Sequence, residues 1–202
     1  MKNTKHIIAI FFFLISINSF SQEIMKPIED ALQDHFKDNP NTYYIDLDGK
    51  LQACVGTWIY NNGIDYFKAV ISKKKVLVNE KHNVYSDELL VKYEYRKNGV
   101  CKYYNISPFN IPAGANTQPS NIKSTFVKNN IIYFLYKEPS LTSCQRRKIG
   151  SLDIQLVTGT ANQLQWTRTT EEHYFRNEPC SDGTPIDNSD FIIPANMVLI
   201  KQ

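Results

Sequence analysis

One stretch constrains the fold of this chain more than any other. Residues Cys54 to Tyr60 read Cys-Val-Gly-Thr-Trp-Ile-Tyr and are followed at once by Asn61-Asn62-Gly63. A run of apolar, β-branched and aromatic residues that ends at Asn-Gly is typical of a strand entering a tight hairpin turn. The sequence therefore predicts an antiparallel hairpin that begins at Cys54.

The predicted register of this hairpin places one apolar face toward a core. If Asn62-Gly63 is a two-residue turn, the facing pairs are Trp58–Phe67, Gly56–Ala69 and Cys54–Ile71. The other face pairs Thr57 with Lys68 and is partly wet. We expect Trp58 to face inward as a structural plug that packs against Phe67, with Gly56 leaving room beside it.

Similar patterns fill the rest of the chain. After a short strand over Tyr43–Leu47, Asn79–Asp87 is a polar connection. The predicted strands beyond it are Leu89–Arg96, Val100–Ser107, Ile122–Lys128, Ile131–Lys137, Ile149–Thr158, Gln163–Tyr174 and Ile192–Lys201. Successive hairpins without intervening helices favour an all-β, up-and-down antiparallel β-barrel of about 8–10 strands. A β-sandwich is the alternative.

The N-terminal region differs from this body. Lys2 and Lys5 precede an apolar run, and Ser19-Phe20-Ser21 provides small residues before a cleavage point. This pattern is typical of a secretory signal peptide, which we expect at 1–21 with cleavage after Ser21. The predicted organisation continues with a helical segment at 22–41, whose helix spans Lys26–Asp38, and a barrel domain at 42–202. The mature protein is expected to be periplasmic or secreted, without a membrane span.

Charge limits the partners of the mature chain. The predicted signal peptide contains two of the 23 Lys and Arg and none of the 20 Asp and Glu, so the mature net charge is about +1. Phosphate binding requires a basic field, so we expect no nucleic-acid partner.

The stretch Gly56-Thr57-Trp58 resembles the first barrel strand of the lipocalin-like (calycin) superfamily. That resemblance implies that Trp58 closes one end of the barrel and packs against a basic residue of a late strand, for which Arg168 beside Trp166 is the candidate. A second resemblance is to a family of small exported flavobacterial proteins of unknown function, carried by 55–63, 93–100 and 194–199. It implies a barrel and export, and no activity.

Catalytic and metal-binding patterns are not found. The sequence contains no Gly-x-Ser-x-Gly elbow and no Gly-rich phosphate loop. Glu171 and His173 are the nearest approach to a constellation, since they share a face of a strand. These observations favour a non-enzyme with no cofactor and no metal site.

Export permits disulfides among the four cysteines. If the last hairpin turns near Thr160-Ala161, Cys144 lies close to Cys180, and we predict a disulfide between them. Cys54 and Cys101 fit a pair less well, and their alternative is to remain reduced and packed.

Two functions remain open. The leading hypothesis is a barrel that binds a small, largely apolar molecule. The competing hypothesis is a protein-interaction or inhibitor module of the cell envelope that uses the long loops 108–121 and 177–190. We expect a monomer in either case. An open interior cavity lined by Tyr and Phe would favour ligand binding, whereas a filled interior together with ordered, exposed aromatic loops would favour the interaction module.

Overall fold

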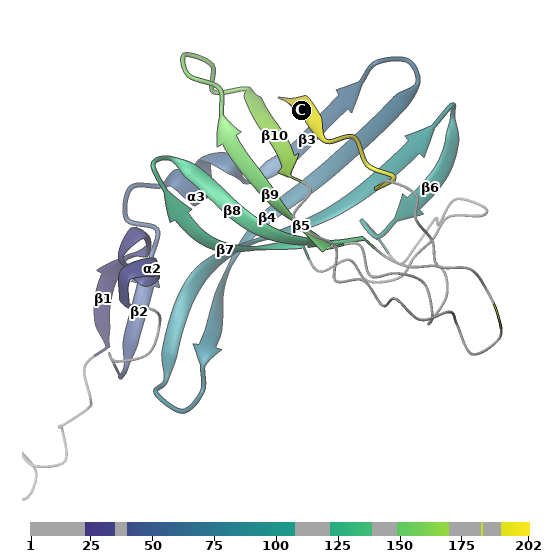
Figure 1. Ribbon diagram of the computed structural model, residues 1–202. Helices are drawn as coiled ribbons and strands as arrows, with labels where there is room; N and C mark the ends of the chain where they lie inside the picture. Colours follow the sequence, from purple (N-terminus) through teal and green to yellow (C-terminus); the bar gives the residue numbers. More distant parts are fainter. Residues whose placement is uncertain (1–22, 35–39, 108–121, 139–148, 170–182, 184–190) are drawn as a thin grey trace, which may run out of the picture.

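The protein is a closed eight-stranded antiparallel barrel (Figure 1). The computed structural model describes residues 23–34, 40–107, 122–138, 149–169, 183 and 191–202. The barrel strands are β3 (Gly56–Asn61), β4 (Asp65–Asn79), β5 (Val84–Lys97), β7 (Ile122–Lys128), β8 (Ile131–Lys137), β9 (Ile149–Leu156), β10 (Gln163–Thr169) and β11 (Asn196–Lys201). Pairing of β11 with β3 and of β5 with β7 closes the barrel. The predicted all-β, up-and-down barrel is confirmed.

Short elements lie outside the barrel wall. A further strand, β6 (Val100–Tyr104), pairs with β5, while β1 (Ile24–Pro27) pairs in parallel with β2 (Thr42–Ile45). The helical elements are η1 (Ile28–Asp30), α2 (Ala31–Asp34) and α3 (Lys50–Cys54). The helix predicted over Lys26–Asp38 is wrong at its start, because β1 continues to Pro27, and 35–39 lie outside the described residues.

Helix α3 corrects the sequence-based boundary of the opening strand. Cys54 was assigned to the strand, but it is the last residue of α3, and β3 begins at Gly56. The preceding Gly49 has a φ of +70°, a left-handed conformation that glycine adopts without strain. This residue turns the chain from β2 into α3.

The polar connection predicted over Asn79–Asp87 is largely strand. β4 runs to Asn79 and β5 begins at Val84, so the turn occupies only 80–83. This long hairpin extends past the barrel, and β2 pairs in parallel with the start of β5 (Figure 1). Ala31, Tyr44 and Val84 form a small second core there. Burial on one face thus stabilises strands whose sequence is rich in charge.

The opening hairpin has a register shifted by two residues from the prediction. Trp58 pairs with Ala69, and Phe67 pairs with Tyr60 instead of Trp58. Asn62 causes the shift, because its N–H donates to Asp65 O and its side-chain oxygen accepts from Asp65 N, which closes a longer turn. A shift of two residues keeps every side chain on its predicted face. Trp58 and Phe67 are accordingly both buried.

The hairpin of β5 and β6 contains a β-bulge. A regular two-residue turn at Asn98-Gly99 would pair Arg96 with Cys101 and Tyr95 with Lys102, but the register slips between Tyr95 and Arg96, so Tyr95 faces Tyr103. The bulge turns Tyr103 toward the interior, where its ring lies 4.2 Å from that of Tyr93.

Large side chains fill the described part of the barrel interior. Phe67 packs edge-on against Trp166 at 4.9 Å between ring centroids and lies 5.5 Å from the Tyr93 ring. Trp58, Trp166 and Phe67 are all fully buried. A small molecule bound by this barrel would therefore have to lie at an end or on the wall.

The turn between β7 and β8 requires positive φ angles at both of its central residues. Asn129 and Asn130 have φ of +52° and +63°, as a type I′ turn requires, and the predicted hairpin across them is confirmed. Replacing Asn130 with glycine is expected to raise the free energy of unfolding by a few tenths of a kcal/mol, because glycine adopts positive φ at no steric cost. The β-branched Asn130→Val is expected to lower it by about 1–2 kcal/mol. Urea unfolding of both variants measures the contrast.

Candidate functional site

One concavity among the described residues lies at one end of the barrel. It has a volume of about 460 Å³ and is bounded by α3 on one side and the β9–β10 turn on the other. Ala53, Cys54, Ile132 and Leu156 give it an apolar bottom, and Lys50, Asn130 and Thr158 belong to its polar rim. We call this concavity the barrel-end groove.

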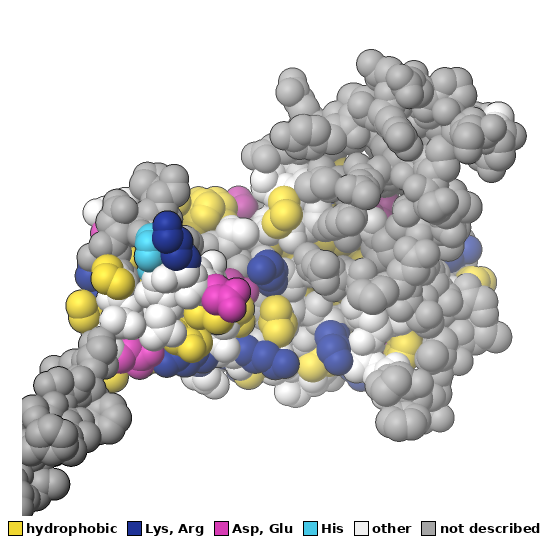
Figure 2. Space-filling model, turned by 90° about the horizontal axis from the view of Figure 1, so that it is seen from below, with side chains coloured by type: hydrophobic (Ala, Val, Ile, Leu, Met, Phe, Trp, Pro, Cys, Tyr) yellow, Lys and Arg dark blue, Asp and Glu magenta, His cyan; other side chains and the backbone are white. Residues whose placement is uncertain are grey.

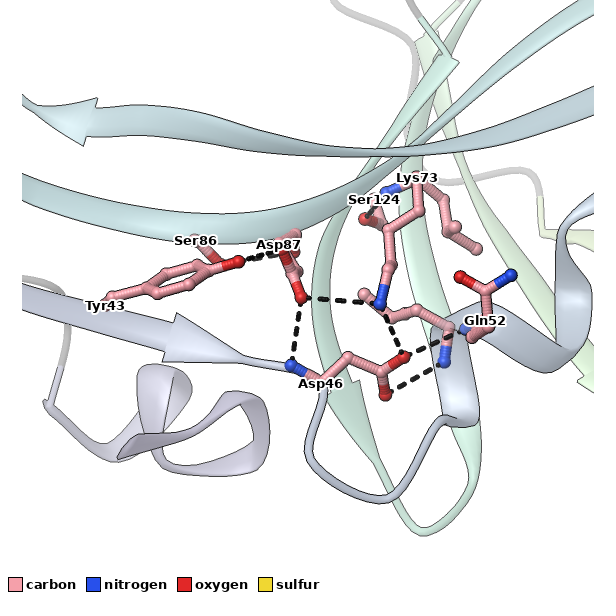
Figure 3. A network of polar contacts seen from close by, with 9 residues as sticks. Tyr43, Asp46, Gln52, Lys73, Ser86, Asp87 and Ser124 are labelled. Atoms are coloured by element: carbon pink, nitrogen blue, oxygen red, sulfur yellow. Dashed lines mark hydrogen bonds and ion pairs between the residues drawn. The ribbon is translucent and has the colours of Figure 1, made fainter. Parts of the chain in front are cut away.

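Asp46 holds the α3 wall of the groove in place (Figure 3). Its two carboxylate oxygens accept hydrogen bonds from Leu51 N at 3.1 Å and from Gln52 N at 2.9 Å. These N–H groups belong to the first turn of α3, where helix geometry leaves donors without a helical partner. Asp46 follows β2 directly, so its carboxylate anchors α3 to the sheet.

A second carboxylate and one lysine complete this network. Asp87 of β5 accepts from Asp46 N at 3.1 Å and from the Tyr43 hydroxyl at 2.6 Å. Lys73 of β4 places its Nζ 3.4 Å from Asp46 Oδ2 and 3.6 Å from Asp87 Oδ2. Burial, together with the bond to Asp87, raises the pKa of Tyr43. Lys73, Asp46 and Asp87 therefore join three separate segments beneath α3.

Trp58 anchors the other end of α3. Its indole N–H donates to Cys54 O at 2.8 Å, so the tryptophan bonds the last residue of the helix. The cation over its ring is Lys201 Nζ, 5.2 Å from the ring, whereas the predicted partner Arg168 lies 4.0 Å over Phe191. Lys201 directly faces Trp58 across β3 and β11. Lys201 could have been considered from the sequence, because it is a basic residue on the last predicted strand.

The residue Gly56 permits this close packing. Its φ is +140°, and a Cβ at this position would lie 3.1 Å from Lys201 Cε. A larger residue would therefore strain the backbone and push Lys201 away from Trp58.

A buried polar cluster at β8 was not predicted from the sequence. Glu138 accepts from Ile192 N at 2.7 Å and from the Tyr136 hydroxyl at 3.3 Å, and Tyr136 in turn lies 3.4 Å from the Tyr93 hydroxyl. Burial raises the pKa of Tyr136 well above its usual range. The cluster joins the segment before β11 to the barrel wall. Glu138 lies one residue beyond the predicted strand Ile131–Lys137, so no strand pattern marked it.

The described cysteines are free thiols. Cys54 and Cys101 are both buried, and burial raises the pKa of Cys54 to about 12. The predicted pair Cys144 and Cys180 lies outside the described residues, as do Glu171 and His173. Loop 108–121 is also outside, and so is loop 177–190 except for Gly183.

The described residues contain neither a metal-binding cluster nor a membrane-spanning helix. No three His, Cys, Asp or Glu side chains in the described ranges are placed to hold a metal ion. Within the same ranges, no helix is long and apolar enough to cross a membrane.

From below, hydrophobic side chains lie among Lys and Arg side chains, so this described surface is chemically mixed (Figure 2).

The fold and groove define the class: a small closed β-barrel, consistent with a lipocalin-like fold, with a concavity at one end. The chain belongs to a family of unknown function (DUF6705), whose model matches residues 1–202. No curated protein and no solved structure matches the chain. The resemblance to a family without an assigned activity is thereby supported.

Proposed function

We propose that the protein is an exported barrel that binds a small, largely apolar molecule in the barrel-end groove. The observation that carries this proposal is the groove's volume of about 460 Å³, which lies within the range of small-molecule sites. Such sites combine an apolar lining with a few polar groups that fix orientation. The barrel-end groove has both.

Because large side chains fill the described part of the barrel interior, the barrel-end groove is a better candidate for the binding site than the interior. Trp58 is fully buried and hydrogen-bonded to Cys54 O, so it stands between α3 and the barrel core. A ligand would contact Ala53 and Cys54 on the helix and Leu156 on β9. The network of Asp46, Asp87 and Lys73 favours this site because it preorganises α3 before a ligand arrives.

The rim favours a ligand with only a small polar part. Lys50 is the basic residue among the described residues of the groove lining, and its Nζ already lies 2.5 Å from Glu29 and 3.4 Å from Asp48. Its charge is therefore largely compensated, which disfavours a strongly anionic ligand. An uncharged, apolar molecule with one or two hydrogen-bonding groups fits best.

Filling the groove is expected to abolish binding. N-phenyl-1-naphthylamine, an uncharged fluorescent probe, should bind the native protein, and Ala53→Trp should weaken its affinity at least ~10-fold by occupying the groove. Gln52→Trp is the matched control, because Gln52 is on the same helix but exposed and outside the groove lining. Equal probe affinity in both variants would contradict the proposal. Native mass spectrometry of protein purified from its own envelope would then identify a natural ligand.

A further inference from the structure

The outer wall of the barrel carries a second concavity of about 490 Å³. It lies over β7, β8, β9 and β10 and shares no lining residue with the barrel-end groove. Its lining side chains and backbone come from Thr125, Phe126, Tyr133, Phe134, Leu135, Ser151, Asp153 and Thr169. We call it the outer-wall concavity.

An aromatic pair forms one side of this concavity. Phe126 and Tyr133 are cross-strand neighbours with ring centroids 4.4 Å apart and planes 19° from parallel. Phe126 covers one face of the Tyr133 ring, so the opposite face is turned toward β9, where Asp153 pairs with Tyr133. Leu135, two residues along the same face of β8, is 51% exposed. The platform therefore combines two half-buried aromatic rings with an exposed leucine, and apolar side chains gathered in this way on a surface mark interaction sites.

The polar groups around the platform mainly accept hydrogen bonds. Thr125 Oγ1 already donates to Tyr133 O at 3.1 Å, and Thr169 Oγ1 donates to Ser151 O at 3.5 Å. Each hydroxyl therefore uses its one proton in a hydrogen bond to the backbone, and its oxygen can still accept a hydrogen bond from a ligand. Asp153 adds a carboxylate, which only accepts when ionised. A ligand that fits must bring several donors.

The described lining of the concavity favours uncharged over anionic ligands. No Lys or Arg is among the eight described lining residues, so this part of the lining offers no cation to a phosphate, sulfate or uronate group. An uncharged ligand with many O–H donors and apolar C–H faces combines the required properties. The polarised C–H bonds of a sugar ring meet the electron-rich face of an aromatic ring, while its hydroxyls donate to the surrounding oxygens.

We propose that the outer-wall concavity is a binding site for a neutral carbohydrate chain, with the Tyr133 ring as its stacking platform. Asp153, Thr125 and Thr169 accept hydrogen bonds from the sugar hydroxyls. The described lining residues come from four neighbouring strands, β7 to β10, which suits a chain of several sugars better than a single one. This site is independent of the ligand proposed for the barrel-end groove.

Affinity electrophoresis tests the proposal. The purified protein is run through native gels that contain glucan, mannan, xylan or galactomannan, with alginate and heparin gels as anionic comparisons. We expect retardation in at least one neutral gel. Tyr133→Ala should reduce the apparent affinity by ~10-fold, because it removes the stacking surface. Tyr133→Phe keeps the ring and should remain within threefold of the native affinity (~0.6 kcal/mol).

A second pair of variants separates occupancy of the site from a change in folding. Ser151→Arg places a long side chain in the concavity and should abolish retardation. Gln165→Arg adds the same charge at a residue of β10 outside the lining and should not. The groove variant Ala53→Trp should also retain retardation, which distinguishes this site from the barrel-end groove. The proposal is overturned by retardation in anionic gels only, by no retardation in any neutral gel, or by retardation that Tyr133→Ala leaves unchanged.

Discussion

Replacing Trp58 with alanine is expected to lower the free energy of unfolding by about 3–5 kcal/mol. The side chain is fully buried, packs in the core of the barrel and donates its N–H to Cys54 O. Its loss leaves a cavity and an unpaired carbonyl at the end of α3, and both effects act in the same direction. Because the free energy of unfolding of a whole domain is only about 5–15 kcal/mol, this single change should remove a large part of the protein's stability. Urea unfolding followed by circular dichroism measures it.

The two tryptophans provide a matched comparison of the hydrogen bond. Trp166 is as deeply buried as Trp58, but its indole nitrogen has no hydrogen-bond partner in the described part of the chain. Trp58→Phe and Trp166→Phe remove similar volume, yet only the first breaks a bond. We expect Trp58→Phe to cost about 1–2 kcal/mol more than Trp166→Phe. Equal costs would show that packing alone explains the role of Trp58.

Much of the fold could be predicted because the residues that determine a hairpin lie close together in the sequence. Asn129-Asn130 and Asn98-Gly99 place positive φ where a two-residue turn needs it, and both turns form. At Asn62-Gly63 the predicted pairing register was wrong by two residues, because the Asn62 side-chain oxygen accepts hydrogen bonds from Ile64 N and Asp65 N and lengthens the turn. The faces survived that error, since side-chain direction repeats every two residues.

The candidate site was harder to predict because it depends on contacts distant in sequence. Asp46 and Asp87 resemble ordinary turn residues, and only the fold brings Lys73 between them. Helix α3 is five residues long, too short for helical periodicity to reveal it. Its stability comes from Asp46 at one end and Trp58 at the other, which a local pattern does not contain.

Replacing Asp46 with alanine is expected to lower the free energy of unfolding by about 2–4 kcal/mol. The change removes the acceptors of Leu51 N and Gln52 N, of which the Leu51 bond is buried, and leaves Lys73 with Asp87 alone. α3 should then fray, so hydrogen exchange at Leu51 and Gln52 should accelerate by at least ~30-fold while the β4–β5 amides stay protected. Mass spectrometry of exchanged peptides distinguishes this local opening from global unfolding.

Two comparisons separate the helix-anchoring role of Asp46 from its charge. Asp46→Asn keeps one acceptor for α3 and loses the ion pair, so its cost should be intermediate, and Lys73→Met tests the ion pair from the other side. In a double-mutant cycle, Asp46→Ala and Lys73→Met should couple by about 1 kcal/mol, because the two groups share a partly buried contact. Since α3 forms one wall of the barrel-end groove, Asp46→Ala should also weaken N-phenyl-1-naphthylamine binding. Faster exchange in α3 with unchanged probe affinity would place the binding site away from α3.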